Sequence, residues 1–174
     1  MAVYTTITQT EAQQLFKPLG EIKKFEGIRE GVENTNYLVH LDDSKKYILT
    51  IFEKRTNEKD LPYFNKLMKI FHNNGVSCPL SVTIKNEDLF RINEKPCCIY
   101  SFVEGRPLLE INKEKLNSLG SSIAHLHKSG INSKLFRKNM MLLPSWKNIT
   151  ESFSRNRTKI HIDEYLSLIH ISEP

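Results

Sequence analysis

The sequence predicts an α+β fold in which an antiparallel sheet with one inserted helix comes first and helices follow. Short apolar or alternating runs, typical of strands, dominate residues 21–103, and only the stretch near 58–74 has a helical period. The break at Glu104-Gly105-Arg106-Pro107 ends this part, and the period after it is helical. We therefore expect a first domain at residues 1–104 and the start of a helical second domain at residues 105–165.

The first domain is expected to begin with a short helix and to continue as three strands. Thr8-Gln9-Thr10-Glu11 has the spacing of a capping box, and Gly20 suits the end of the helix. Strands are expected at residues 21–30, 35–41 and 47–52. The third is apolar on both faces, which predicts a central place in the sheet.

A helix from Glu58 to Asn74 is expected next, because apolar residues recur there at steps of three and four. These residues are Leu61, Phe64, Leu67, Met68 and Phe71. Pro62 is tolerated in the first turn, and Gly75 suits the C-terminal cap. Strands at residues 80–84, 89–92 and 96–103 complete the expected sheet.

The second domain is expected to open with a helix that Asn112 caps and that runs to Ser129. Its apolar face is formed by Leu116, Leu119, Ile123 and Leu126. Residues 131–145 have no clear period and are expected to form a loop, and residues 146–168 are weakly patterned as a helix.

Composition and charge exclude several classes of protein. No apolar run approaches the roughly 18 residues of a membrane span, and the N-terminus lacks the features of a signal peptide, so a cytoplasmic location without membrane contact is expected. Residues 131–160 hold seven Lys or Arg against one acid, but no aromatic platform is interleaved with them, which favours a solvated basic face over nucleic-acid binding. The net charge of +5 also suits an anionic ligand.

The cysteines and histidines offer no metal site. The three cysteines include no C-x-x-C pair and are expected to be small buried hydrophobic residues. His125 and His127 lie two apart on an expected helix, so their side chains point about 200° from each other and cannot share one metal ion.

One hairpin turn and one strand end are candidate binding sites. The hairpin turn after the first strand exposes consecutive backbone N–H groups that can hold phosphate oxygens, although a plain polar hairpin explains the same residues. It comprises Gly31, Val32, Glu33, Asn34, Thr35 and Asn36. The strand that ends at Ser101, Phe102, Val103 and Glu104 leaves unpaired backbone groups at the domain junction, where the edge of a base can bind, although an ordinary strand end is the alternative.

Taken in order, these segments resemble the bacterial homoserine kinases of the aminoglycoside phosphotransferase-like superfamily. The likeness covers roughly residues 1–150, and its most specific parts are Gly31-Val32-Glu33-Asn34-Thr35-Asn36-Tyr37-Leu38 and Tyr47-Ile48-Leu49-Thr50-Ile51-Phe52-Glu53-Lys54-Arg55. Phe102-Val103-Glu104-Gly105 and the helix end at Leu126-His127 continue it.

The resemblance implies the small lobe of a protein kinase-like fold, followed by the first helices of a truncated large lobe. It implies ATP between the lobes, Mg²⁺ as the metal, and phosphate transfer to the hydroxyl of L-homoserine in threonine biosynthesis. Carried over, Gly31–Asn36 would cover the phosphates and Ser101–Glu104 would meet the adenine. Thr50 would stand where protein kinases have a strand lysine, and the sequence leaves open whether Lys54 or Arg55 contacts ATP.

The sequence departs from this family in its last part. The His-x-Asp-Leu-x-x-x-Asn loop of the family is missing, and Ile169-His170-Ile171-Ser172-Glu173 has Ser172 in place of the catalytic Asp. No catalytic residue and no metal ligand is therefore expected in this chain, which alone should be inactive. The catalytic Asp is expected downstream of Pro174, and residues 166–174 are expected to be a non-native tail.

Two other hypotheses remain open. The chain could be a non-catalytic module that binds a nucleotide or a partner, or part of a related kinase with another acceptor. The acceptor pocket of this superfamily lies mainly in the large lobe, so the residues present do not choose between acceptors. The sequence carries no signal for an oligomeric state.

Overall fold

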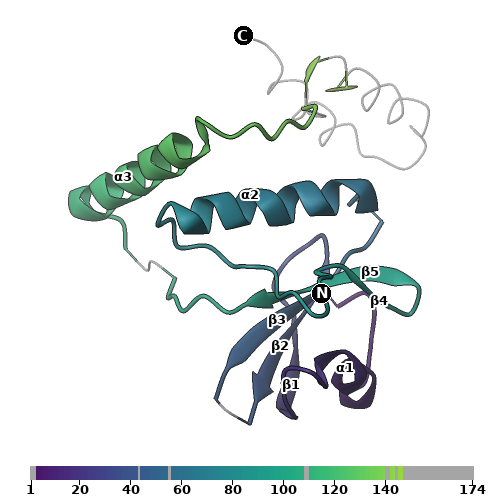
Figure 1. Cartoon of the computed structure of the whole chain (residues 1–174). Coiled ribbons are helices and arrows are strands. Elements are labelled where there is room, and N and C mark those ends of the chain that lie inside the picture. The colour runs from purple at the N-terminus through teal and green to yellow at the C-terminus, as the bar shows by residue number, and fades with distance from the viewer. Residues whose placement is uncertain are drawn as a thin grey trace, which may run out of the picture. The chain divides into compact units, whose positions relative to one another are not determined.

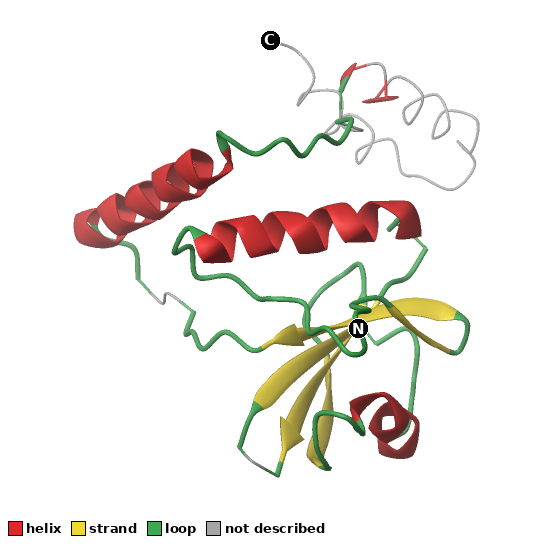
Figure 2. Ribbon diagram, in the orientation of Figure 1, coloured by secondary structure: helices red, strands yellow, loops and turns green. Residues whose placement is uncertain are grey.

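The computed structural model describes residues 3–42, 44–54, 56–107, 110–139, 142–143 and 145–146. Contacts divide the chain into one compact unit up to Leu135 and another from Phe136, and every helix and strand named below belongs to the first unit. That unit holds a five-stranded antiparallel sheet with the order β1-β2-β3-β5-β4 (Figures 1 and 2). The strands are β1 (Ile22–Ile28), β2 (Thr35–Leu41), β3 (Lys46–Ile51), β4 (Phe90–Ile92) and β5 (Lys95–Ser101).

Three α-helices accompany the sheet: α1 (Gln9–Phe16), α2 (Leu61–Asn73) and α3 (Lys113–Gly130). The predicted capping box is confirmed, because Thr8 accepts from the N–H of Glu11 while the Glu11 carboxylate accepts from the N–H of Thr8. A short 3-10 turn, η1 (Glu58–Asp60), precedes α2, and Pro62 occupies the first turn of that helix. Asn112 caps α3 as predicted by accepting from the N–H of Lys115.

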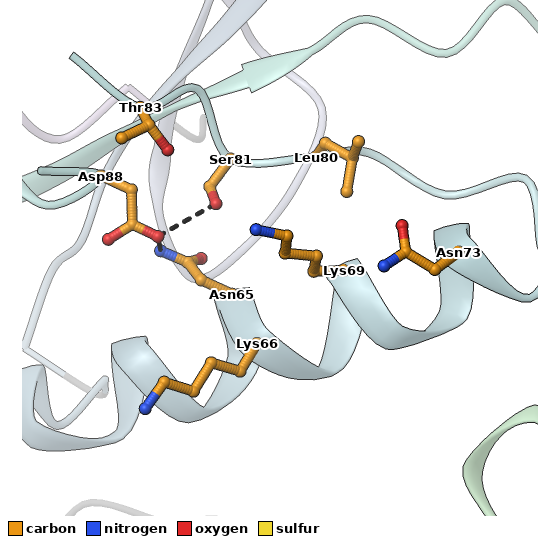
Figure 3. A pocket seen from close by; sticks show the side chains of 8 residues that line it. All are labelled: Asn65, Lys66, Lys69, Asn73, Leu80, Ser81, Thr83 and Asp88. Carbon is orange, nitrogen blue, oxygen red and sulfur yellow. Dashed lines mark hydrogen bonds between the residues drawn. The ribbon is translucent and has the colours of Figure 1, made fainter. Parts of the chain in front are cut away.

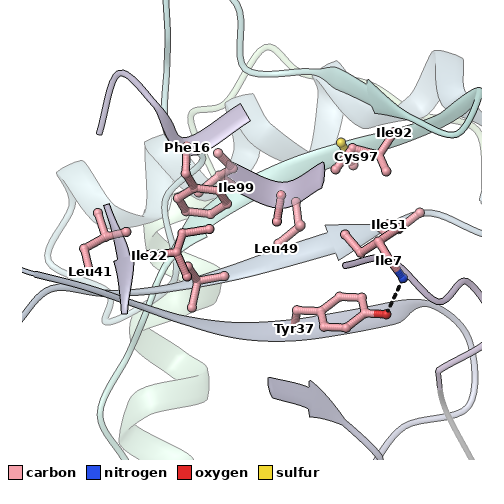
Figure 4. Close-up of a cluster of buried hydrophobic side chains, with 12 residues drawn as sticks. Ile7, Phe16, Ile22, Tyr37, Leu41, Leu49, Ile51, Ile92, Cys97 and Ile99 are labelled. Carbon is pink, nitrogen blue, oxygen red and sulfur yellow. Dashed lines mark hydrogen bonds between the residues drawn. The ribbon is translucent and has the colours of Figure 1, made fainter. Parts of the chain in front are cut away.

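One face of the sheet packs against α1 and forms the main core (Figure 4). Alternate residues of β2 are buried, which confirms the predicted face of Tyr37, Val39 and Leu41. β3 is the middle strand of five, as its apolar sequence predicted. The cluster on this face comprises Ile7, Ala12, Phe16, Ile22, Tyr37, Val39, Leu41, Leu49, Ile51, Ile92, Cys97 and Ile99.

The opposite face of the sheet packs against α2. Leu61 of this helix is buried with Phe52 and Cys98, next to the half-buried Tyr100. Cys97 and Cys98 are fully buried as predicted, whereas Cys78 is half-buried. Burial raises the pKa of Cys97 to about 12, so this thiol stays protonated at neutral pH.

The predicted strand at residues 80–84 was wrong. Ser81 forms a single bridge to Tyr100, and Ile84 pairs only with Glu87. The chain turns at Lys85 and Asn86, both with positive φ, and this turn prevents a longer ladder. β5 ends at Ser101, two residues before the predicted end.

The apolar face of α3 is exposed. Leu116, Leu119, Ile123 and Leu126 lie on it with 38–54% of their surface accessible. Residues 131–139 contain no regular helix, in agreement with the first part of the loop predicted at 131–145, whereas Leu143 and Ser145 are helical. The helix predicted at 146–168 lies, apart from Trp146, outside the described residues. Within the described part of the chain, no helix has the length and apolar character to cross a membrane.

The first prediction concerns Tyr37, whose buried hydroxyl joins the N-terminal segment to β2. It donates to the carbonyl of Thr5 at 2.9 Å and accepts from the N–H of Ile7 at 3.1 Å. Tyr37→Phe leaves both backbone groups without this partner, so we expect the free energy of unfolding to fall by about 1–3 kcal/mol in urea titrations. Tyr4→Phe is the matched control, because the Tyr4 hydroxyl also donates to a carbonyl but lies exposed, and it should cost about 0.5 kcal/mol or less. Equal effects of the two variants would contradict this account.

Candidate functional site

A cavity of about 390 Å³ lies where β3, β5 and α2 meet. Four of the residues predicted to bind a cofactor line it: Thr50, Ser101, Phe102 and Val103. The rest of the lining is formed by Ile48, Met68, Pro79 and Tyr100. Glu104 lines a neighbouring hollow that shares Ser101, Phe102 and Val103 with the first. We call the 390 Å³ space the hinge cavity.

Strand alternation points these side chains toward the cavity. Leu49 and Ile51 of β3 belong to the core on the α1 side, so Ile48 and Thr50 face the α2 side. Ile48 stands opposite Tyr100 in the antiparallel register of β3 and β5. The result is an apolar slot with a few polar groups, of a volume that suits a planar base.

The backbone at the end of β5 is only partly paired. The N–H of Ser101 donates to the carbonyl of Leu80 at 2.8 Å, and the N–H of Phe102 donates to the carbonyl of Lys46 at 3.3 Å. The N–H of Val103 makes no hydrogen bond within the described part of the chain. Because Val103 lines the cavity, this N–H is a donor that a ligand could use.

An ion pair braces the same segment. The Lys46 ammonium lies 2.6 Å from a carboxylate oxygen of Glu104 and 5.2 Å from the ring centre of Phe102. Both contacts join the start of β3 to the segment after β5. Since the Glu104 side chain is 74% exposed, we assign the ion pair a positioning role with little stabilising energy.

The predicted phosphate hairpin meets the hinge cavity at one residue. The Thr50 hydroxyl donates to the side-chain oxygen of Asn36 at 2.8 Å, so Asn36 lies next to the cavity wall. The Asn34 side chain accepts from the N–H of Glu53 at 3.3 Å and holds the turn to the end of β3. Gly31, Val32 and Glu33 form the exposed tip and do not line the cavity; Gly31 has a φ of 118°, a conformation that favours glycine.

Thr35 belongs to a different arrangement, which sequence reasoning missed. Its side chain is fully buried, accepts from the N–H groups of Tyr4 and Thr5, and donates to Glu53 at 2.8 Å. The Glu53 carboxylate also pairs with the ammonium of Lys95. The side chain of Thr35 therefore anchors the hairpin to the core and is not available to a ligand. No local pattern could have revealed this, because Lys95 lies 42 residues from Glu53.

A second buried polar group was also missed. Asn65 of α2 is 3% exposed, and its side-chain oxygen accepts from the Tyr100 hydroxyl at 2.9 Å. Its amide donates to Asp88 at 3.1 Å. Burial raises the pKa of Tyr100, which keeps this phenol protonated as a donor. The sequence did contain one signal for this buried group, because Asn65 is a polar residue among the apolar positions of the predicted helix.

The fold is that of a kinase-like small lobe, and comparisons with known proteins agree with it. The chain belongs to the phosphotransferase enzyme family, whose model matches residues 24–155. It is 37% identical over 155 residues to a homoserine kinase of Parvibaculum lavamentivorans, covering 87% of this chain and 48% of that protein. A homoserine kinase of Brucella ovis is 36% identical over 151 residues, covering 84% of this chain and 46% of that protein. The chain thus spans about half the length of these relatives. The matches confirm the resemblance inferred from the sequence.

Solved structures support the fold. A spectinomycin phosphotransferase in complex with ADP and spectinomycin superposes with a TM-score of 0.66 at 14% identity, covering 91% of this chain and 50% of that one. An amicoumacin kinase in complex with AMP-PNP and Ca²⁺ superposes with a TM-score of 0.63 at 14% identity, covering 88% and 55%. The predicted α+β fold with a kinase-like small lobe is confirmed.

The second prediction concerns pH and Glu53. Burial alone would raise the pKa of this carboxyl, but hydrogen bonds from Lys95, Thr5 and Thr35 and the charge of Lys95 outweigh it and lower the pKa below 4.5. A lowered pKa in the folded state stabilises the protein above the unfolded value, and this contribution is lost as the pH falls below 4.5. In urea titrations at about pH 7, Glu53→Gln should lower the free energy of unfolding by about 1–3 kcal/mol. The variant should also lose less of its stability than the wild type as the pH falls into the acid range.

Glu26→Gln is the matched control for this experiment. Glu26 pairs with Lys24 on the surface, where the carboxylate side chain is 49% exposed. Its loss should change stability by about 0.5 kcal/mol or less at every pH. The role given to Glu53 is wrong if its variant and the wild type lose stability in parallel between about pH 5 and pH 3.

Proposed function

We propose that this chain is the nucleotide-binding part of an ATP-dependent kinase that phosphorylates the hydroxyl of L-homoserine. The observation that carries the proposal is the hinge cavity, which gathers four predicted residues beside a free backbone donor. The similarity to two homoserine kinases at 36–37% identity supports the acceptor.

In this proposal, the adenine of ATP enters the hinge cavity. Ile48 and Met68 supply apolar contact from β3 and α2. The N–H of Val103 and the carbonyls beside it recognise the edge of the base, and the Lys46–Glu104 pair holds this segment in place. Thr50 then links the base site to the phosphate site through its bond to Asn36.

The phosphates of ATP are assigned to the hairpin at Gly31–Asn36. Its backbone N–H groups would contact phosphate oxygens, and the bonds of Asn36 and Asn34 would keep the tip from moving away. ATP supplies the phosphoryl group, and the part of the chain described here supplies binding and orientation.

The residues around the hinge cavity do not fit a magnesium ion. Its lining includes no carboxylate among the described residues, and oxygen ligands of that kind are what Mg²⁺ prefers. The catalytic Asp and the metal ligands are proposed to lie in the other half of the whole protein.

The activity test uses the whole protein that contains this chain and measures ADP release in a coupled assay. We expect kcat/KM for L-homoserine to exceed that for choline or spectinomycin by about 100-fold or more. The 174-residue chain should bind a fluorescent ATP analogue and release no homoserine-dependent ADP. Preference for another acceptor would overturn the substrate, and homoserine-dependent release by the chain alone would overturn the assignment of catalysis to the other half.

A further prediction tests the link between base site and phosphate site. Thr50→Val keeps the size of the side chain and removes the donor to Asn36. We expect the Kd of the fluorescent ATP analogue to rise about five-fold, as the loss of one hydrogen bond implies. Thr10→Val is the control, because Thr10 lies exposed on α1 away from the cavity. Unchanged affinity of Thr50→Val would remove Thr50 from the site.

A further inference from the structure

A second cavity of about 230 Å³ lies between α2 and the segment 80–88 (Figure 3). Its lining is formed by Asn65, Lys66, Lys69, Asn73, Leu80, Ser81, Thr83 and Asp88. It shares no lining residue with the hinge cavity. We call it the α2 cavity.

The α2 cavity holds side chains of opposite charge that form no ion pair with each other among the described residues. Asp88 supplies a carboxylate and Lys69 an ammonium, and no ion pair within the described residues joins either to a partner. Figure 3 shows Lys69 reaching along the cavity toward Ser81, while Lys66 points away from Asp88. A cavity lined by a carboxylate and by lysine ammonium groups is complementary to a ligand that carries both charges.

Hydrogen bonds within the described residues hold one of the two carboxylate oxygens of Asp88. One of its oxygens, Oδ2, accepts from the Asn65 amide and from the Ser81 hydroxyl, each at 3.1 Å. The other oxygen has no hydrogen bond within the described part of the chain. Asn65 is itself buried and bonded to Tyr100, so the wall behind the carboxylate is fixed before any ligand arrives.

We propose that the α2 cavity binds a compact zwitterion of the size of a small free amino acid. Its ammonium would pair with Asp88 and its carboxylate with Lys69, with Thr83 and Asn73 as further polar partners. The volume excludes a nucleotide and admits only a few heavy atoms beyond the two charged groups.

The same structure connects this cavity to the hinge cavity. The hydrogen-bond chain from Asp88 through Asn65 ends at Tyr100, which lines the hinge cavity. A ligand on Asp88 would therefore alter a residue of the base site. This step rests on the proposed function, because it assumes a nucleotide in the hinge cavity.

Binding is tested on the 174-residue chain by NMR titration with three matched probes. L-Serine carries both charges, ethanolamine lacks the carboxylate, and 3-hydroxypropionate lacks the ammonium. We expect L-serine to bind at least about ten-fold more tightly than either truncated probe, with shifts at residues 65–88. Equal binding of 3-hydroxypropionate or inorganic phosphate would reveal a simple anion site and overturn the proposal, as would an absence of binding by L-serine.

Variants identify the two charged partners. Lys69→Gln and Asp88→Asn should each weaken the binding of L-serine about ten-fold, because each removes one charge and keeps a polar side chain. Lys59→Gln is the control, since Lys59 is exposed in η1 and does not line the cavity. Near-ultraviolet circular dichroism verifies that each variant is folded. Equal effects of Lys59→Gln and Lys69→Gln would contradict the site.

The connection is tested with the fluorescent ATP analogue. Saturating L-serine should change its Kd about two- to five-fold in the wild type and leave it unchanged in Tyr100→Phe, which cannot donate to Asn65. The same change in both proteins would overturn the hydrogen-bond route. If the chain binds L-serine and no nucleotide, the proposed function fails and the connection with it, while the zwitterion site stands on its own titration.

Discussion

The two-sided burial of the central strand is the constraint on which the rest of this structure depends. Successive residues of β3 face opposite sides, so Leu49 and Ile51 complete the core against α1 while Ile48 and Thr50 face α2. A slip of one residue in the pairing with β5 would bury Thr50 in the apolar core and withdraw Leu49 from it. The hydrophobic effect that fixes the register therefore also fixes the walls of the hinge cavity.

Buried polar groups refine what this apolar pattern establishes. Within the described residues, no buried side-chain nitrogen or oxygen lacks a hydrogen-bond partner. Asn65 ties α2 to β5 through Tyr100, and Glu53 ties the hairpin to the N-terminal segment through Thr5 and Thr35. An unpaired polar group at these depths would cost about 1–3 kcal/mol, so each network tolerates few other arrangements. Such networks orient helix and hairpin more sharply than apolar contacts, which permit sliding.

Periodicity predicted the elements of the fold, because alternation and helical spacing are local properties. It found α1 with its capping box, β2 with its buried face and α3 with its Asn112 cap. It failed at residues 80–84, where the backbone turns at Lys85 and Asn86 and a strand-like run makes only bridges. Periodicity could not predict the hydrogen-bond partners of Glu53 and Asn65, because contacts between distant segments do not affect local residue spacing. By contrast, the predicted residues Ser101, Phe102 and Val103 line one cavity, because they follow one another in the chain.

The assignment of the fold and the proposal of the acceptor depend on different comparisons. Two antibiotic kinases share this lobe at 14% identity, which shows that the same backbone serves phosphotransferases whose acceptors differ. If this lobe binds the nucleotide as proposed, it has no need to change when the acceptor does, because the base and the phosphates are the same in each case. The proposed acceptor is supported instead by the 36–37% identity to homoserine kinases, which extends over more than four-fifths of this chain. If the α2 cavity binds a zwitterion, a site for an amino acid would also exist in the lobe to which we assign the nucleotide, apart from any acceptor pocket.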